Sequence, residues 1–271
     1  MKIRLNEAVA QAAYGTTLGQ LRRAKKPAAD VIIYNGVVMR PAEASRCVLK
    51  AGDRVALIKR GEKPSAAKMR RLLCARNTPG VTERLRKTVI GIAGAGGLGS
   101  NAAMALARSG VGRLIVADFD VVEPSNLNRQ VYSVSQIGMR KVLALKENIR
   151  AANPYVRVDA VKIRLNKENA ARVFAKADIL LEAFDDRDAK AMLAAAFCCR
   201  FPKRPLILAS GLAACADSNS IRTRRLSPYV YVVGDMITGA APGVGLMAPR
   251  VGIAACHQAN LALRLALKLE K

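Results

Sequence analysis

The chain has 271 residues, 51% of them hydrophobic, and a formal net charge of +25. This length and composition suit a globular protein with an aliphatic core, in one large domain or two smaller ones. The longest uncharged stretch, residues 88–107, is too rich in glycine for a good membrane span. The positive field attracts nucleotides, acidic proteins and nucleic acid, and charge alone does not select among these partners.

The cysteine pattern and the N-terminus indicate the compartment. Six cysteines occur, none of them in a C-x-x-C pair, and the first residues, MKIRL, resemble a strand rather than an apolar leader segment. We therefore expect a reduced, cytoplasmic protein with mostly buried thiols. Without C-x-x-C pairs, no structural zinc site is expected.

Residues 1–63 predict a small domain of their own. Residues 1–12 favour a hairpin, residues 16–25 a short helix, and residues 30–36 a strand that ends in an Asn-Gly turn. Residues 50–61 predict a turn and a closing strand. This order is typical of a small α+β domain with the β-grasp, or ubiquitin-like, fold.

Residues 64–88 predict a basic linker with a helical turn, after which strands and helices alternate. The predicted strands are residues 88–94, 113–119, 156–163, 177–184 and 205–211, and the predicted helices are residues 101–110, 135–154, 188–201 and about 249–269. Alternation of this kind predicts an α/β, Rossmann-like domain over residues 89–271, with a mostly parallel, doubly wound sheet.

A glycine run between the first strand and helix of this domain predicts a nucleotide site. It matches G-x-G-x-x-G from Gly94 to Gly99, and Asp118 follows nineteen residues later at the end of the next strand. Such glycines let backbone N–H groups approach phosphate, and an acid at that position can bind ribose hydroxyls.

Further charged and amide side chains follow that a dinucleotide does not require. Asn126, Arg129 and Lys141 come soon after the second strand, and Asp185 follows the fourth. Fixed positive charge suits a triphosphate, whose cleavage needs a stabilised leaving group. A carboxylate at the same sheet edge could hold Mg²⁺ against phosphates.

The stretch GAGGLGSNAAMALARSGVGRLIVADFDVVEPSNLNRQ resembles the core signature of the ThiF/MoeB superfamily of ubiquitin-activating-type adenylating enzymes. The similarity runs from about Val89 to near the C-terminus and is closest to the compact ThiF-type subfamily of thiamine biosynthesis. The N-terminal domain resembles the ThiS-type sulfur carrier. The resemblance implies a homodimeric, ATP-dependent adenylyltransferase that activates the C-terminal carboxylate of a carrier ending in free Gly-Gly and releases pyrophosphate.

The same resemblance assigns roles by position. Asp118 would bind the ribose, and Asp185 would bind Mg²⁺. The phosphates would be held by Asn126, Arg129 and Lys141. The expected catalytic residues are Arg129, Lys141 and Asp185. The expected ATP-site residues are Gly94, Gly96, Gly97, Gly99, Asp118, Asp120, Asn126, Arg129, Lys141 and Asp185.

Several positions depart from the family pattern. The segment ALIKRGEKPS continues into the linker, so the N-terminal domain has no free carboxylate to activate. It is either a pseudo-carrier that regulates access or assembly, or a fusion with only a packing role. Cys215 is the nearest candidate for an acyl-capturing cysteine, but we expect a buried small residue there. Arg76 is a weak substitute for the family's upstream arginine, and His257 is expected to be structural.

Three other functions stay open. They are an enzyme that adenylates a modified tRNA base, an NAD-dependent oxidoreductase, and a non-catalytic carrier-binding scaffold. The first is consistent with the positive charge, and the second has no role for Arg129 and Lys141. The sequence does not identify the carrier or the sulfur donor.

Overall fold

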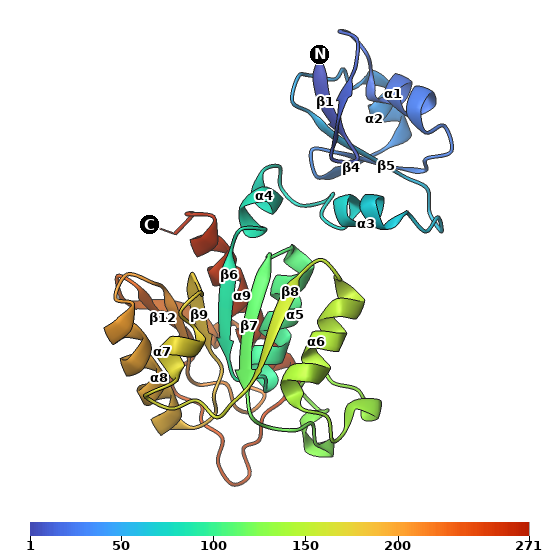
Figure 1. The fold of residues 1–271 in the computed structure, drawn as a ribbon. Helices are drawn as coiled ribbons and strands as arrows, with labels where there is room; N and C mark the ends of the chain where they lie inside the picture. The colour runs from blue at the N-terminus through green and yellow to red at the C-terminus, as the bar shows by residue number, and fades with distance from the viewer. Residues whose placement is uncertain (271) are drawn as a thin grey trace. The chain divides into compact units, whose positions relative to one another are not determined.

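The computed structural model describes residues 1–270. The chain divides into two compact units, Met1–Thr82 and Glu83–Lys271, which are coloured from blue to cyan and from green to red in Figure 1. The segment predicted as a linker, residues 64–88, is divided between them. Within the described residues, no helix is both long enough and apolar enough to cross a membrane.

The first unit has the β-grasp arrangement that the sequence predicts. Its elements are β1 (Lys2–Leu5), β2 (Ala8–Gln11), α1 (Leu18–Lys25), β3 (Val31–Tyr34), β4 (Val37–Met39), α2 (Pro41–Arg46), β5 (Arg54–Ile58) and α3 (Ala66–Leu72). The sheet order is β2-β1-β5-β3-β4, with β1 and β5 parallel at the centre and the other pairs antiparallel. Strand β4 and helix α2 are additions to the predicted elements.

Local chemistry explains why these elements form. Thr17 and Gln20 make a capping box at the start of α1. Asn35 and Gly36 both have positive φ and turn β3 back into β4. The buried carboxylate of Asp53 accepts hydrogen bonds from Tyr34 Oη and Asn35 Nδ2, at 2.9 and 3.1 Å, which fixes that hairpin to the turn before β5.

The second unit is a doubly wound α/β domain, which confirms the predicted fold class. Its strands are β6 (Val89–Ala93), β7 (Arg113–Asp118), β8 (Arg157–Lys162), β9 (Ile179–Glu182), β10 (Leu206–Ala209), β11 (Arg222–Ser227) and β12 (Val230–Gly234). In residues 83–270 they form one sheet in the order β11-β12-β10-β9-β6-β7-β8, parallel except for the edge strand β11. The order reverses between β6 and β9, so this is where a ligand site is expected.

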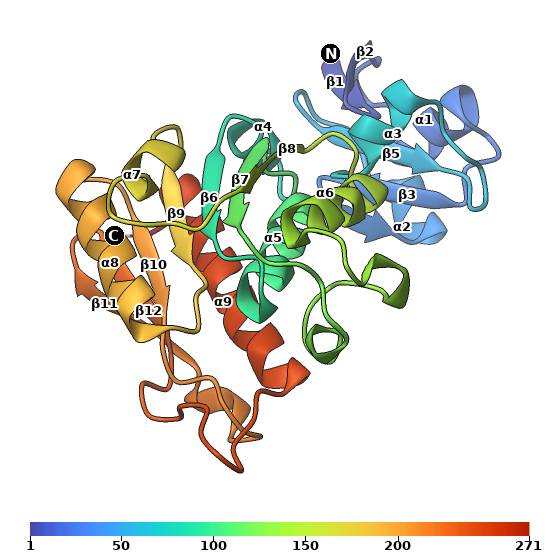
Figure 2. The ribbon, with the colours of Figure 1, turned by 60° about the horizontal axis from the view of Figure 1, so that its bottom comes forward.

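Helices cover both faces of this sheet (Figures 1 and 2). They are α5 (Gly97–Ser109), α6 (Lys141–Ala152), α7 (Ala170–Val173), α8 (Arg187–Arg200) and α9 (Ala248–Ala266); the short helix α4 (Val81–Leu85), which begins at the end of the first unit, precedes β6. Residues of α5, α6 and α9 share one apolar core with the sheet. Residues of α7 and α8 pack in a second core on the other face.

The structure corrects several predicted boundaries. Helix α5 begins at Gly97, within the glycine run, and not at residue 101. The predicted helix over residues 135–154 is wrong at its start: Val134–Gln136 is a 3-10 turn, Gly138 has φ +86°, and α6 begins at Lys141. Helix α7 and strands β11 and β12 are additional elements. A positive φ cannot continue a right-handed helix, which explains the break at Gly138.

Candidate active site

A cavity of about 830 Å³ opens at the carboxyl ends of β6, β7 and β9. Its wall includes the glycine run, the residues after β7, the turn after β9, and loop residues before α9. The position beside the reversal of strand order and the size both suit a small-molecule ligand.

The glycine run forms one side of this cavity. Gly94 has φ +99°, and a Cβ on Gly99 would lie 1.9 Å from the carbonyl oxygen of Gly94. The first turn of α5 therefore packs directly on the end of β6. At Gly96 the space is open on the cavity side, so backbone N–H groups at the start of α5 are accessible to an anion.

Asp118 supports this loop from the end of β7. Its Oδ2 accepts a hydrogen bond from the Ala95 N–H at 2.6 Å, and its Oδ1 accepts one from the Asp120 N–H at 2.7 Å. The Tyr132 hydroxyl donates to the Ala95 carbonyl at 2.7 Å. Burial, followed by the charge of Asp118, raises the pKa of Tyr132, so this hydroxyl stays protonated and keeps donating.

Asp120, two residues after Asp118, has a cation as its partner. Lys141 Nζ lies 3.0 Å from Asp120 Oδ2, with Lys141 buried and Asp120 half-exposed. The Lys141 N–H donates to the Asp120 carbonyl at 3.0 Å. The two predicted site residues thus lie together at the start of α6, and they bind each other.

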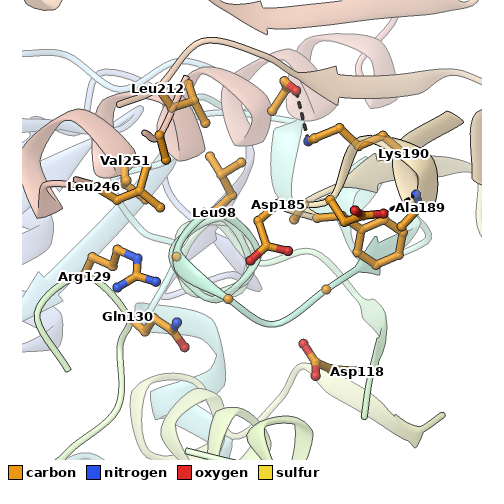
Figure 3. Close-up of a pocket in the computed structure, with 18 of the residues that line it drawn as sticks. Leu98, Asp118, Arg129, Gln130, Asp185, Ala189, Lys190, Leu212, Leu246 and Val251 are labelled. Atoms are coloured by element: carbon orange, nitrogen blue, oxygen red, sulfur yellow. Dashed lines mark hydrogen bonds between the residues drawn. The ribbon is translucent and has the colours of Figure 1, made fainter. Parts of the chain in front are cut away.

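Arg129 and Asn126 lie on the segment between β7 and α6. Asn126 is buried, and its Oδ1 accepts a hydrogen bond from the Glu123 N–H at 3.1 Å. Arg129 Nη1 donates only to neutral oxygens, those of Ser125 and Asn128, at 3.1 and 2.8 Å. Within residues 1–270 the guanidinium forms no ion pair and lines the cavity, as Figure 3 shows. Its charge is therefore available to an anionic ligand.

Asp185 lies on the turn between β9 and α8, and its carboxylate faces the glycine run (Figure 3). The side chain is exposed. No group of three or more His, Cys, Asp or Glu residues in the described chain is arranged to hold a metal ion. A cation at Asp185 would therefore need further oxygens from a bound ligand, which is the usual manner of Mg²⁺ with phosphates.

The structure adds an ion pair that sequence reasoning missed. Glu182, the last residue of β9, is fully buried, and Lys190 Nζ lies 2.9 and 3.0 Å from its two carboxylate oxygens. Burial raises the pKa of Glu182, while Lys190 and two backbone N–H groups oppose this shift. The only sequence signal was a charged residue at the end of the apolar run ILLE.

The cysteines correct another prediction. No disulfide joins any of the six; Cys47, Cys74 and Cys198 are half-buried, and Cys199, Cys215 and Cys256 are exposed. The expectations of mostly buried thiols and of a buried Cys215 are wrong. Cys215 lies in the loop after β10, and Cys199 and Cys256 lie on the outer faces of α8 and α9. His257 is half-buried and faces Thr223 Oγ1 at 3.4 Å.

Comparison with known families agrees with this architecture. Residues 69–271 match the ThiF family, and residues 1–61 match the ThiS-like ubiquitin family. The chain therefore belongs to the ThiF family and carries a ThiS-like ubiquitin domain before it. The family resemblance drawn from the sequence is confirmed.

Individual relatives cover different shares of the chain. A sulfur carrier protein adenylyltransferase of Thermus thermophilus is 38% identical over 118 residues, 43% of this chain and 44% of that protein. A molybdopterin-synthase adenylyltransferase of Haemophilus influenzae is 33% identical over 196 residues, 70% of this chain and 79% of that protein. The E. coli tRNA N6-threonylcarbamoyladenosine dehydratase TcdA in complex with ATP has a TM-score of 0.67 at 25% identity, over 76% of this chain and 98% of that chain. The two sequence relatives carry names that match the predicted enzyme class.

Proposed function

We propose that this chain is an ATP-dependent adenylyltransferase that activates the C-terminal carboxylate of a sulfur carrier protein. The observation that carries the proposal is the common cavity of the glycine run, Arg129, Lys141 and Asp185. Membership of the ThiF family and the names of the relatives support the reaction type. The ATP-bound TcdA structure supports ATP as the nucleotide.

The reaction needs positioning and charge neutralisation more than acid–base chemistry. A carboxylate oxygen of the carrier attacks the α-phosphorus of ATP, the bond from that phosphorus to the bridging oxygen breaks, and pyrophosphate leaves with the electron pair. The products are a carrier acyl-adenylate and pyrophosphate. Because the carboxylate is already ionised, the chain's own groups orient the reactants and stabilise the leaving charge.

Each charged residue has a part in this proposal. The N–H groups at the start of α5 and the guanidinium of Arg129 would bind phosphate oxygens. Lys141, held in place by Asp120, would add a second positive charge. Asp185 would hold Mg²⁺ together with phosphate oxygens, which fits an exposed carboxylate that faces the cavity.

The finer assignment follows the N-terminal domain and the subfamily that the sequence resembles. We propose a ThiS-type carrier with a free C-terminal Gly-Gly as substrate, a place in thiamine biosynthesis, a homodimeric enzyme and a cytoplasmic location. The name of the Haemophilus relative makes a molybdopterin-type carrier the main alternative substrate.

ATP–pyrophosphate exchange tests the proposal directly. We expect exchange that requires Mg²⁺ and a carrier ending in free Gly-Gly. Arg129→Ala should lower the rate by about 10²–10³-fold, the usual loss on removing one group that stabilises developing charge. The matched control is Arg108→Ala, an exposed arginine on the last turn of α5, which should exchange at the wild-type rate. Exchange that continues without carrier, or tight NAD binding in place of ATP, would contradict the proposal.

A second candidate function is adenylation of a modified tRNA base. The net charge of +25 and the similarity to TcdA favour it over the remaining alternatives. Adenylate formation that needs tRNA and not carrier would establish this function. Tight binding to tRNA alone would not, because any strongly basic surface binds polyanions in low salt.

A further inference from the structure

A buried carboxylate anchors the turn that carries Asp185. Glu182 ends β9 and has no exposed surface. Its Oε1 accepts the Phe184 N–H at 2.6 Å, and its Oε2 accepts the Ala209 N–H of β10 at 3.2 Å. The Glu182 carbonyl accepts Gln258 Nε2 of α9 at 2.9 Å. One side chain thus joins the ends of two strands and the first residues of the turn.

Lys190 completes this network from the first turn of α8. Its Nζ donates to both oxygens of Glu182, at 2.9 and 3.0 Å, and to the Ala209 carbonyl at 3.1 Å. Its backbone N–H donates to the Asp186 carbonyl at 3.1 Å. An ammonium has three N–H groups, so all of them have acceptors within the protein.

The turn between these anchors is therefore held at both ends. The Phe184 N–H is bound to Glu182, and Asp186 caps α8 by accepting the Ala189 N–H at 2.7 Å. Asp185 lies between them with its carboxylate directed into the cavity (Figure 3). We propose that Glu182 and Lys190 are positioning residues that set the place of the Asp185 carboxylate; this inference rests on the proposed role of Asp185 toward MgATP.

The main competing role for Lys190 is direct contact with phosphate. Lys190 lines the cavity and is partly exposed, as a phosphate-binding lysine would be. The three acceptors around Nζ argue against it, because phosphate contact would break part of the pair and leave a buried carboxylate uncompensated. Breaking a buried ion pair is costly.

MgATP binding measured by calorimetry without carrier separates these roles, since no turnover occurs. We expect Lys190→Met to raise the Mg²⁺ concentration for half-maximal ATP binding by about 10–100-fold, the usual effect of removing support for a metal ligand. ATP affinity in EDTA should stay at the wild-type value. In Asp185→Asn the Mg²⁺ dependence should be lost, and Lys190→Met/Asp185→Asn should equal Asp185→Asn alone.

Two further variants keep the test decisive. Glu182→Gln/Lys190→Met removes both buried charges and should show the same Mg²⁺ shift, which covers the case in which Lys190→Met does not fold. Asp159→Asn breaks the ion pair with Arg113, between β7 and β8, and should leave the Mg²⁺ dependence unchanged.

Other outcomes would overturn the inference. If Lys190→Met binds ATP more weakly than wild type in EDTA, Lys190 is a direct phosphate ligand. The same conclusion follows if the combined variant Lys190→Met/Asp185→Asn binds MgATP more weakly than Asp185→Asn alone. An unchanged Mg²⁺ dependence in folded Lys190→Met would remove the positioning role. Failure of the proposed function would be recognised separately from failure of this inference, because the wild-type protein would then show no pyrophosphate exchange in the presence of carrier.

Discussion

At the scale of single residues, Arg250 joins two loops on the β10–β12 side of the second unit. Its guanidinium is buried near the start of α9 and donates to Asp235 Oδ2 at 2.5 Å and to the Asp217 carbonyl at 2.8 Å. Asp235 also accepts Thr238 N–H and Oγ1, at 2.8 and 2.7 Å. This ion pair thus helps to hold the loop after β12, which lines the cavity through Thr238.

This pair predicts a pH dependence. Burial would raise the pKa of Asp235, but hydrogen bonds from Thr238, Ile237 and Arg250 outweigh it and lower the pKa from 3.8 to about 2. A carboxylate with a depressed folded-state pKa stabilises the fold fully above its unfolded value, and that contribution is lost as the pH falls from about 4 to about 2. At about 1.4 kcal/mol per unit of pKa, Asp235→Asn should therefore cost about 2 kcal/mol at pH 7, and the difference from wild type should shrink between pH 4 and pH 2.

Urea unfolding of both proteins across this pH range measures the difference. Asp159→Asn, which breaks a more exposed pair, should cost less at pH 7. A difference in the free energy of unfolding between wild type and Asp235→Asn that stays constant from pH 7 to pH 2 would contradict the lowered pKa of Asp235.

The residue scale also shows what the sequence could predict of the site. The charged residues of the site follow parallel strands whose carboxyl ends lie at the same edge of the sheet. Their common location could therefore be inferred from the order of strands and helices alone. The ion pair between Asp120 and Lys141 could not be inferred in this way. Both residues are predicted to bind the same ligand, and the sequence does not show that they also bind each other. Glu182 and Lys190 are eight positions apart on different elements, and no periodicity connects them.

At the scale of elements, the contact between β6 and α5 shows that Gly96 and Gly99 are needed for different reasons. A Cβ on Gly99 would overlap the Gly94 carbonyl at 1.9 Å, whereas a Cβ on Gly96 would meet nothing within 4 Å and its φ is −77°. Packing therefore requires glycine at position 99. Position 96 would accept an alanine in the folded chain, but it borders the cavity.

Two alanine variants separate these requirements. Gly99→Ala should lower the free energy of unfolding by about 1–3 kcal/mol or more, as overpacking does, and should weaken ATP binding with it. Gly96→Ala should unfold like the wild type, yet bind ATP more weakly because the methyl group occupies space beside the N–H groups. Thermal unfolding with and without ATP measures both. Equal melting temperatures for the two variants would contradict this division.

Most strands and helices of the second unit follow from hydrophobic pattern, and the exceptions have physical causes. Strand β11, RTRRLS, is exposed along its whole length, so it lacks the apolar alternation that marks a strand. The start of α6 depends on the conformation of Gly138, which a pattern of side chains does not report. The short helix α7 has four residues and too little length for a helical period.

At the scale of the whole molecule, the first unit differs from a free carrier at its end. After β5 the chain turns back, with the Glu62 N–H donating to the Lys59 carbonyl at 3.3 Å and Lys26 Nζ bound to Glu62 at 2.6 Å. The segment that would be a free tail in a carrier is thus a tethered turn. This argues against a role of the domain as the adenylated substrate, and it is compatible with both a pseudo-carrier and a fusion that has only a packing role.

Deleting residues 1–63 tests that hypothesis. If the domain regulates access or assembly, the truncated protein should change its KM for a free carrier or its oligomeric state, measured by pyrophosphate exchange and by light scattering. Asp53→Asn in the full chain, which weakens the hairpin contacts of the first unit, should move the same readouts in the same direction. Unchanged activity and unchanged assembly after deletion would leave the domain with only a packing role.

The edge strand β11 has a consequence for how copies of the protein meet. Arg222, Arg224 and Arg225 are exposed along it, and the pairing with β12 shifts register near its end. Two such edges brought together would set arginine against arginine across an irregular ladder, which disfavours extension of the sheet from one molecule to the next. The charge on β11 therefore disfavours aggregation through this edge of the sheet, and concentrated salt, which screens the repulsion, is the condition under which such aggregation would first develop.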